Sequence, residues 1–423
     1  MKTYRVSEVF VPGGLPTHTY VARTERGLEE GLENACDNLC KVATVTGATK
    51  SGKTVLVRKV LGMVPRVWLD GGQIHSLADF WDSIGEQLKT ASEVLSTDIK
   101  EEMIEVGGEV AAEANAMVIK GGSKVSAKSS SKDGAQTSAK RATHRPTSVS
   151  KALLADKTPI VIDDFHYLKR ELQGQITRAL KPLVFDGVPV IYLAIPHRRY
   201  DAVKVEREMN GRIELIAVPA WSTDELTSIA QRGFPLLNIV PHEETSRQLA
   251  IEAHGSPHLM QEFCKKICSI SGLKETAESA HMIQPNFPYA TIFEQVALSL
   301  GKNIYDKLAK GPRSRSDRIQ RKLKVGGSVD IYKVVLRALA SLKPGVSTIE
   351  YEPLRRAIRD ILVDTPPQGH EVSRVLEQMA KVSALDESSV PVIDYEKDEQ
   401  KLHITDPFFA FFLKWGGKLI NES

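Results

Sequence analysis

The stretch from Gly47 to Thr54 constrains the fold of this chain more than any other segment. It reads G-A-T-K-S-G-K-T, a complete G-x-x-x-x-G-K-[ST] pattern. Apolar residues 42–46 before it predict a buried strand, and residues 55–61 behind it predict a helix. Its glycines let backbone N–H groups turn inward around an anion, and the helix N-terminus adds its positive end. The flanking elements favour a phosphate-binding loop over a chance Gly-rich turn.

The side chains of this loop predict its ligands. Lys53 is placed to reach the β- and γ-phosphates of a nucleotide, and the hydroxyl of Thr54 is placed to bind Mg²⁺. We therefore expect ATP and Mg²⁺ to bind here. The residues expected to bind the cofactor are Gly47, Ala48, Thr49, Lys50, Ser51, Gly52, Lys53 and Thr54.

Length and composition set wider limits. A chain of 423 residues predicts two or three domains. A hydrophobic fraction of 42% with 26% charged residues is typical of soluble globular proteins. The sequence has neither an apolar run long enough for a membrane span nor the apolar core of a signal peptide at its N-terminus, so we expect a cytoplasmic protein without a membrane partner. A net charge of +3 does not by itself indicate a nucleic-acid binder.

The cysteines form two pairs at helical spacing. The spacing predicts that Cys36 and Cys40 share one helix face, and likewise Cys264 and Cys268. Side chains packed in helical cores are favoured, because this spacing is not the usual zinc knuckle. A zinc site from both pairs is the less favoured alternative.

Downstream of the loop, residues 66–70 predict a second strand and residues 77–88 a helix, the alternation of a parallel α/β sheet. A flexible basic insertion is expected at about residues 95–150. Residues 121–150 contain eight serines, six Lys or Arg and one acidic residue, a composition too polar to bury a core. A basic arm that grips phosphates or a partner is the alternative.

Residues 158–164 form an apolar strand that ends in two carboxylates, which is the form of a Walker B motif. We expect this strand to lie beside the strand before the phosphate loop, so that its acids reach the metal. Asp163 would hold Mg²⁺ through its water shell, and Asp164 would orient or deprotonate the attacking water. A solvated turn is the alternative for two adjacent acids.

A further strand is predicted at residues 188–195, and His197 follows it. With this strand, the order of motifs resembles the AAA+ superfamily, in particular its origin-recognition branch, and the related STAND signalling ATPases. The resemblance implies a P-loop ATPase fold of α/β class, in which the position of His197 carries the sensor 1 residue. The family usually has Asn, Thr or Ser there, so a simple strand end is equally favoured.

The same resemblance implies further site residues. An N-terminal box would place Tyr20, Val21 and Arg23 beside the adenine, although the family's Gly-Arg-Glu is not intact. Arg207 or Arg212 would serve as an arginine finger on a neighbour's γ-phosphate. Ordinary surface arginines are the favoured alternative for these two.

After residue 220 the sequence turns helical. Ser222 and Glu225 form a capping box that opens a helix, and the segment to residue 300 resembles the AAA+ lid. Pro257 and His258 follow a Gly at the family's sensor 2 turn, where an Arg often contacts the phosphates. This chain carries His258 in place of that Arg, so a plain helix cap is as plausible here as a sensor 2 role.

The C-terminal third resembles a winged helix of origin-recognition ATPases and of a group of archaeal ATPases. Residues 306–324 carry eight basic and two acidic residues and read as a linker or exposed helix. The elements expected beyond them are helices at 331–340, 352–358 and 370–379 and a hairpin at 390–404. The expected domains are a core at 1–220, a lid at 221–300, a basic linker at 301–328 and a winged helix at 329–423.

Two functions follow from these features. The favoured one is an ATP-hydrolysing switch that couples nucleotide state to assembly or partner engagement, possible settings being a defence or regulatory system. It would form a homo-oligomer on activation, and its effector would be a separately encoded protein. The alternative is an ATP-dependent DNA-binding initiator or transposition-type regulator that uses residues 121–150 or 306–324. Residues 330–415 carry eleven Lys or Arg against fourteen Asp or Glu, a net charge of −3 that is a poor footprint for DNA.

Overall fold

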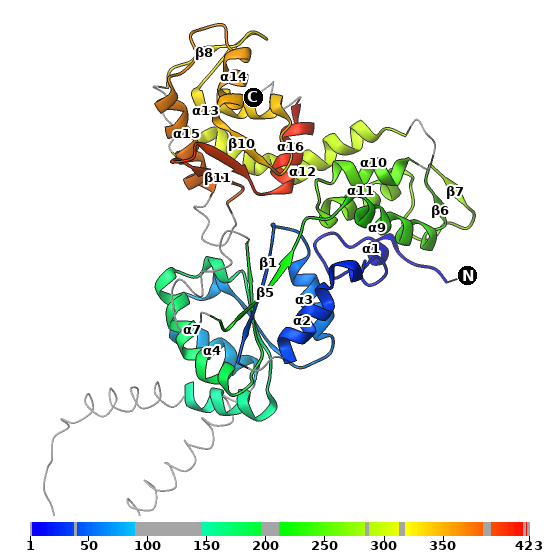
Figure 1. The fold of residues 1–423 in the computed structure, drawn as a ribbon. Helices are drawn as coiled ribbons and strands as arrows, with labels where there is room; N and C mark the ends of the chain where they lie inside the picture. Colours follow the sequence, from blue (N-terminus) through cyan, green and yellow to red (C-terminus); the bar gives the residue numbers. More distant parts are fainter. Residues whose placement is uncertain are drawn as a thin grey trace, which may run out of the picture. The chain divides into compact units, whose positions relative to one another are not determined.

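The computed structural model describes residues 2–37, 40–88, 146–195, 211–242, 244–283, 287–312, 318–383, 391–417 and 420 (Figure 1). The chain divides into two compact units. The first unit comprises Met1–Gly31, Thr46–Gly62 and Ile216–Ser423, and the second comprises Leu32–Val45 and Met63–Leu215. The phosphate loop and the C-terminal third therefore belong to the same unit.

The central sheet has five strands in the order β2-β3-β4-β1-β5. Its strands are β1 (Val42–Gly47), β2 (Val67–Asp70), β3 (Ile160–Asp163), β4 (Val190–Ala194) and β5 (Ile213–Val218). The pairs β2–β3 and β3–β4 are parallel, as the α/β pattern predicts. One expectation was wrong: β4 lies between β3 and β1, so the strand with the paired acids is not next to the strand before the loop.

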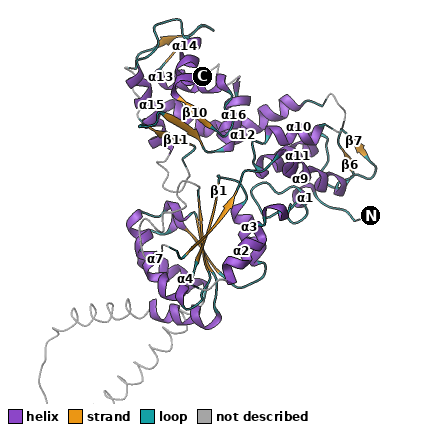
Figure 2. Cartoon of the chain, in the orientation of Figure 1, coloured by secondary structure: helices purple, strands orange, loops and turns teal. Residues whose placement is uncertain are grey.

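The second unit packs helices on the apolar strands. Its main helices are α4 (Leu77–Gln87), residues 146–156 and α7 (Arg170–Phe185). Ser76 begins α4 by accepting a hydrogen bond from the backbone N–H of Asp79 at 3.1 Å. Phe80 and Trp81 of α4 pack with Ile162 of β3 in one hydrophobic core. Figure 2 shows α4 and α7 as neighbouring helices beside the strands.

Most of the expected basic insertion lies outside the described residues, which resume at residue 146. Residues 146–150, which the sequence placed in that insertion, form the start of a helix. Val149 is buried there, in the core of the second unit. The described structure therefore places the end of the insertion a few residues earlier than the composition does.

In the first unit, a helical segment follows the sheet (Figure 1). Its elements are α9 (Thr223–Leu236), β6 (Ile239–Val240), α10 (Thr245–Glu252), α11 (Pro257–Ile270), β7 (His281–Met282) and α12 (Tyr289–Lys310). The predicted capping box at Ser222 and Glu225 is present at the start of α9. The N-terminal elements of this unit are α1 (Val6–Val9) and η1 (Thr24–Arg26), and α2 (Leu28–Asp37) begins here and ends in the second unit.

The C-terminal segment contains the three expected helices and the expected hairpin. Its elements are β8 (Arg321–Lys322), β9 (Ser328–Val329), α13 (Ile331–Leu342), β10 (Thr348–Glu350), α14 (Tyr351–Ile361), α15 (Gly369–Ser383), β11 (Ile393–Glu396), β12 (Lys401–Ile404) and α16 (Pro407–Trp415). Strand β10 was not predicted, yet it pairs antiparallel with β12 and makes the hairpin a three-stranded sheet. The strand has only three residues and one buried apolar side chain, Ile349. It is therefore too short to show the alternation of apolar and polar residues from which a strand is predicted.

One helix, α12, runs through the expected boundary between lid and linker. Residues 301–310, which were assigned to the linker, therefore continue this helix, and residues 313–317 lie outside the described part. Helix α12 also joins the lid to the C-terminal segment through one core. The ring of Phe293 lies 4.9 Å from that of Trp415 and 5.9 Å from that of Phe411. A Cβ at Gly301 would lie 2.3 Å from the Cβ of Phe412, so α12 and α16 pack very closely.

Each cysteine has an apolar or partly buried setting. Cys264 and Cys268 are buried in the core of the first unit, and burial raises the pKa of both thiols. All four cysteines are free thiols. Within the described residues, no group of three or more His, Cys, Asp or Glu could hold a metal ion. No helix among them is long and apolar enough to cross a membrane.

Candidate nucleotide site

The phosphate loop has the predicted strand–loop–helix form. Strand β1 ends at Gly47, and α3 (Lys53–Leu61) begins directly after Gly52. Gly52 has a φ of +91°, a conformation that favours glycine. A Cβ at Gly47 would lie 2.7 Å from the backbone oxygen of Val218, so this position has no room for a side chain. Gly52 is thus favoured by its own backbone conformation, and Gly47 by the close approach of Val218.

Side chains of the loop point to an anionic ligand. Lys53 is only 8% exposed, and its Nζ donates to the carbonyl oxygens of Gly47 and Ala48, both at 2.9 Å. The hydroxyls of Thr49 and Ser51 are buried and have no hydrogen-bond partner among the described residues. Buried hydroxyls without partners are costly unless a ligand satisfies them. The loop therefore fits nucleotide phosphates, and Thr54 lies partly buried in the first turn of α3, where its hydroxyl could bind Mg²⁺.

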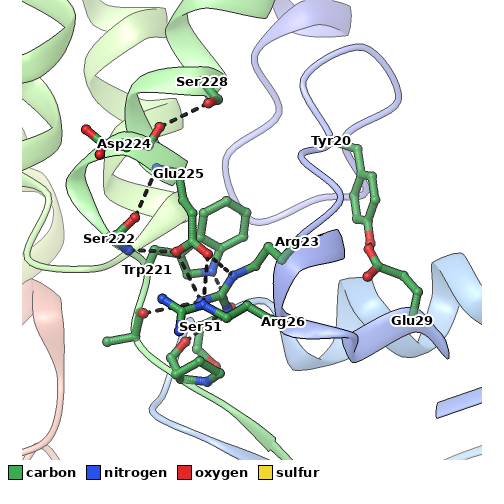
Figure 3. A network of polar contacts seen from close by, with 12 residues as sticks. Tyr20, Arg23, Arg26, Glu29, Ser51, Trp221, Ser222, Asp224, Glu225 and Ser228 are labelled. Atoms are coloured by element: carbon green, nitrogen blue, oxygen red, sulfur yellow. Dashed lines mark hydrogen bonds and ion pairs between the residues drawn. The ribbon is translucent and has the colours of Figure 1, made fainter. Parts of the chain in front are cut away.

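A partly buried polar network ties the loop to the start of the lid (Figure 3). The indole Nε1 of Trp221 donates to the backbone oxygen of Ser51 at 2.8 Å. Arg23 lies over the indole ring, 4.9 Å from its centroid, and is bound by Glu225 at 2.9 Å and 3.1 Å. Arg23 also donates to the backbone oxygens of Pro219 and Ala220. The guanidinium thus joins the N-terminal segment, the end of β5 and α9.

Glu225 is the shared acceptor of this network. Its carboxylate also accepts from the backbone N–H of Ser222 at 2.7 Å, and Arg26 lies 3.5 Å away. Partial burial would raise the pKa of Glu225, but the hydrogen bonds from Arg23 and Ser222 and the charges of Arg23 and Arg26 hold it below its ordinary value. Glu225 is therefore ionised at neutral pH. The sequence predicted Glu225 only as part of a helix cap. Trp221, directly before that cap, was the one local feature that could have indicated the polar network.

Two other residues of the N-terminal box have structural partners. The hydroxyl of Tyr20 donates to Glu29 at 2.7 Å, and burial with this hydrogen bond raises the pKa of Tyr20. Val21 is 7% exposed and belongs to the core of the first unit. Their expected place beside an adenine stays a prediction.

The turn before α11 lies against the phosphate loop. A Cβ at Gly52 would lie 4.0 Å from the ring of Pro257, and Ser256 caps the helix. His258 packs edge-on against Phe408 at 4.8 Å. Burial, together with the nearby charge of Lys50, lowers the pKa of His258 to about 4, although Asp406 opposes this shift. His258 is thus neutral at pH 7 and is not a charged sensor in this arrangement.

The paired acids lie at the carboxyl end of β3 in the second unit. Asp163 ends the strand, and Asp164 follows with a φ of +53°, a conformation that is uncommon outside glycine but that aspartate adopts more readily than most residues. A Cβ at Gly71 would lie 2.5 Å from the backbone oxygen of Asp164, so the neighbouring strand also ends tightly against this turn. Asp70 stands opposite Asp163 in the parallel register and is a third acid at this edge, one that no sequence motif singled out.

Of the remaining predicted site residues, only Arg212 lies in the described part. It is partly buried before β5, and its backbone oxygen accepts from the N–H of Val42 at 2.9 Å. His197 and Arg207 lie outside the described residues. The role of an arginine finger on a neighbouring subunit stays a prediction for both Arg207 and Arg212.

Comparison with known proteins supports the fold. No protein-family model matches the sequence, and no curated protein matches it. The Walker-type ATPase PabY2304 of Pyrococcus abyssi superposes with a TM-score of 0.52 at 13% identity, over 93% of this chain and 96% of that one. The chain has the fold of a Walker-type P-loop ATPase.

Two weaker similarities are to an ORC1 protein and to a Cdc6p. The Aeropyrum pernix ORC1 protein, solved in complex with DNA, matches at 12% identity with a TM-score of 0.44, over 100% of this chain and 97% of that one. Cdc6p from Pyrobaculum aerophilum matches at 13% identity with a TM-score of 0.38, over 98% of each chain.

Proposed function

We propose that this protein is an ATP-binding and ATP-hydrolysing switch, in which the nucleotide state at the phosphate loop changes how the C-terminal segment engages a partner. The observation that carries this proposal is the hydrogen bond from Trp221 to Ser51. Through it the loop that would bind the phosphates is bonded directly to the lid, and the lid shares one core with the C-terminal segment.

In this function the loop residues bind and the acids promote hydrolysis. Backbone N–H groups of the loop, the N-terminus of α3 and Lys53 bind the phosphates. Asp164 orients the attacking water and accepts its proton as the bond between the γ-phosphorus and the β–γ bridging oxygen breaks, giving ADP and phosphate. Thr54 and Asp163 would hold Mg²⁺, which neutralises charge on the phosphates when it is bound.

The C-terminal segment is the proposed output. Its order of helix, strand, two helices and hairpin supports a winged helix at residues 329–423. We propose that its partner is a separately encoded protein and that the ATP-bound form self-associates. DNA is the less favoured partner, because two arginines of the basic linker are already paired within the first unit. Arg318 binds Asp330 at 2.9 Å, and Arg321 binds Glu371 at 3.3 Å.

Nucleotide binding and turnover test the proposal. We expect Lys53→Ala to abolish ATP binding measured by calorimetry, because the loop loses its main cation. Asp164→Asn should bind ATP like the wild type but lose turnover in a phosphate-release assay. Lys265→Ala, on the exposed face of α11, is the control lysine and should match the wild type in both. Wild-type protein that binds no ATP, or an Asp164→Asn variant that hydrolyses at the wild-type rate, would contradict the proposed chemistry.

A further inference from the structure

The phosphate loop contains a second lysine whose ammonium does not bond to the loop. Lys50 has a φ of +60° and follows Thr49 at the crest of the motif. Its Nζ is bonded to Oδ2 of Asp406 and lies 3.6 Å from the ring centroid of Phe408. Lys53, by contrast, donates to carbonyl oxygens of the loop itself. The two lysines of one loop therefore have different partners, and that of Lys50 lies in the C-terminal segment.

Asp406 performs two tasks with its two carboxylate oxygens. Oδ1 caps α16 by accepting from the backbone N–H groups of Phe408 and Phe409, at 2.8 Å and 2.9 Å. Oδ2 accepts from Lys50. The Asp406 side chain is only 8% exposed, whereas that of Lys50 is 27% exposed. A buried carboxylate depends on its counter-charge, so the start of α16 depends on the position of Lys50.

Helix α16 is one of the elements that hold the C-terminal segment in the core of the first unit. Phe411 and Phe412 are fully buried in the common core. At its other end, Glu252 of α10 binds Lys414 at 2.7 Å and the indole of Trp415 at 2.8 Å. The helix is thus held at its C-terminal end by the lid and at its N-terminal end by the phosphate loop.

Phosphates bound at the loop would disturb only the anchor at the N-terminal end of α16, which joins Lys50 to Asp406. A bound triphosphate brings several negative charges next to Lys50, whose flexible side chain carries one compact charge. It offers Lys50 a competing anion, and it repels the carboxylate of Asp406. Glu252 belongs to α10, and its partners Lys414 and Trp415 lie on α16, so the anchor at the C-terminal end of α16 contains no residue of the loop.

We propose that Lys50 is a positioning residue that reads phosphate occupancy: ATP and Asp406 compete for its ammonium, and ATP binding frees the N-terminus of α16. This inference rests on the proposed binding of ATP at the loop. It adds to the bond between Trp221 and Ser51 a second connection, the ion pair between Lys50 and Asp406, which joins the loop directly to the C-terminal segment. By reciprocity, removing the carboxylate must strengthen ATP binding by the factor with which ATP weakens the pair.

Equilibrium titration with Mg-ATP, using Asp164→Asn as the background to prevent turnover, tests this. Asp406→Asn is the informative change, because asparagine caps a helix about as well as aspartate and α16 stays capped. We expect it to tighten ATP binding by about fivefold or more, the low end of coupling between linked sites. Lys50→Met should weaken binding, and Asp406→Asn added to it should change the affinity much less.

Two controls separate this role from a merely structural one. Lys50→Arg keeps the charge and should retain near-wild-type affinity together with the response to Asp406→Asn. Glu252→Gln disturbs the other end of α16 and should lower stability without changing ATP affinity. ATP binding that depends on Lys53 but has equal affinity with and without the Asp406 carboxylate would overturn the inference and leave the proposed function standing. Absence of ATP binding by the parent protein would overturn both.

Discussion

Replacing Arg23 should destabilise the first unit far more than replacing Arg26, although both arginines face the same carboxylate. The side chain of Arg23 is 4% exposed and binds Glu225 through two hydrogen bonds, whereas that of Arg26 is 49% exposed and lies 3.5 Å from the same acid. Arg23→Ala and Arg26→Ala are therefore a matched pair that differ in burial.

The expected magnitudes follow from that difference. Breaking a buried ion pair by removing one partner costs about 3–5 kcal/mol. Glu225 is 18% exposed and keeps its bond from Ser222, so we expect Arg23→Ala to cost about 3 kcal/mol, the low end of that range. Exposed ion pairs contribute about 0–1 kcal/mol, which is the range expected for Arg26→Ala.

Urea unfolding followed by tryptophan fluorescence measures both, because the indole of Trp221 lies against Arg23. The midpoint should fall much further for Arg23→Ala, with an unchanged slope. The difference should also shrink in acid. The pKa of Glu225 is lower in the folded protein than its ordinary value of 4.5, so the stabilisation is present above that value and is lost as the pH falls through the folded pKa. Equal losses for the two variants at pH 7 would refute the assignment of Arg23 as the buried partner.

Two further predictions concern packing and pH. Gly301→Ala should lower the free energy of unfolding by about 1–3 kcal/mol, because its Cβ would lie 2.3 Å from the Cβ of Phe412. The control is Gly31→Ala, whose Cβ would have no atom within 4 Å and which should be neutral or stabilising in the same thermal melt. A stabilised Gly301→Ala variant would contradict the close contact of α12 and α16. The unfolded chain protonates His258 near 6.5 and the folded protein only near 4, so stability should fall as the pH is lowered between these values, and His258→Gln should flatten this slope. An identical pH profile for that variant would show that His258 does not titrate this way.

The sequence predicted the parts of the site that lie within one local motif. Gly47 to Thr54 defines its own backbone, so the strand, loop and helix around it could be read directly. The acids after β3 were equally local, but the sequence could not give the strand order that places β4 between β3 and β1. Strand order depends on how distant segments pair, which a local pattern does not record.

The contacts that join the loop to distant segments were not predictable from these patterns. Trp221 and Ser51 are 170 residues apart, and Lys50 and Asp406 are 356 residues apart. Each of these side chains has an ordinary local explanation, as part of a motif, a helix cap or an apolar surface. Arg23 was expected near an adenine on the basis of family resemblance, and the network around Glu225 emerged only from the folded structure.

Hydrogen exchange with and without Mg-ATP tests the proposed switch most directly. We predict that ATP slows exchange of the loop amides at residues 47–54 and speeds exchange in the first turn of α16, and that Lys53→Ala shows neither change. Slower exchange confined to the loop, with α16 unaffected, would contradict a switch that acts through the C-terminal segment.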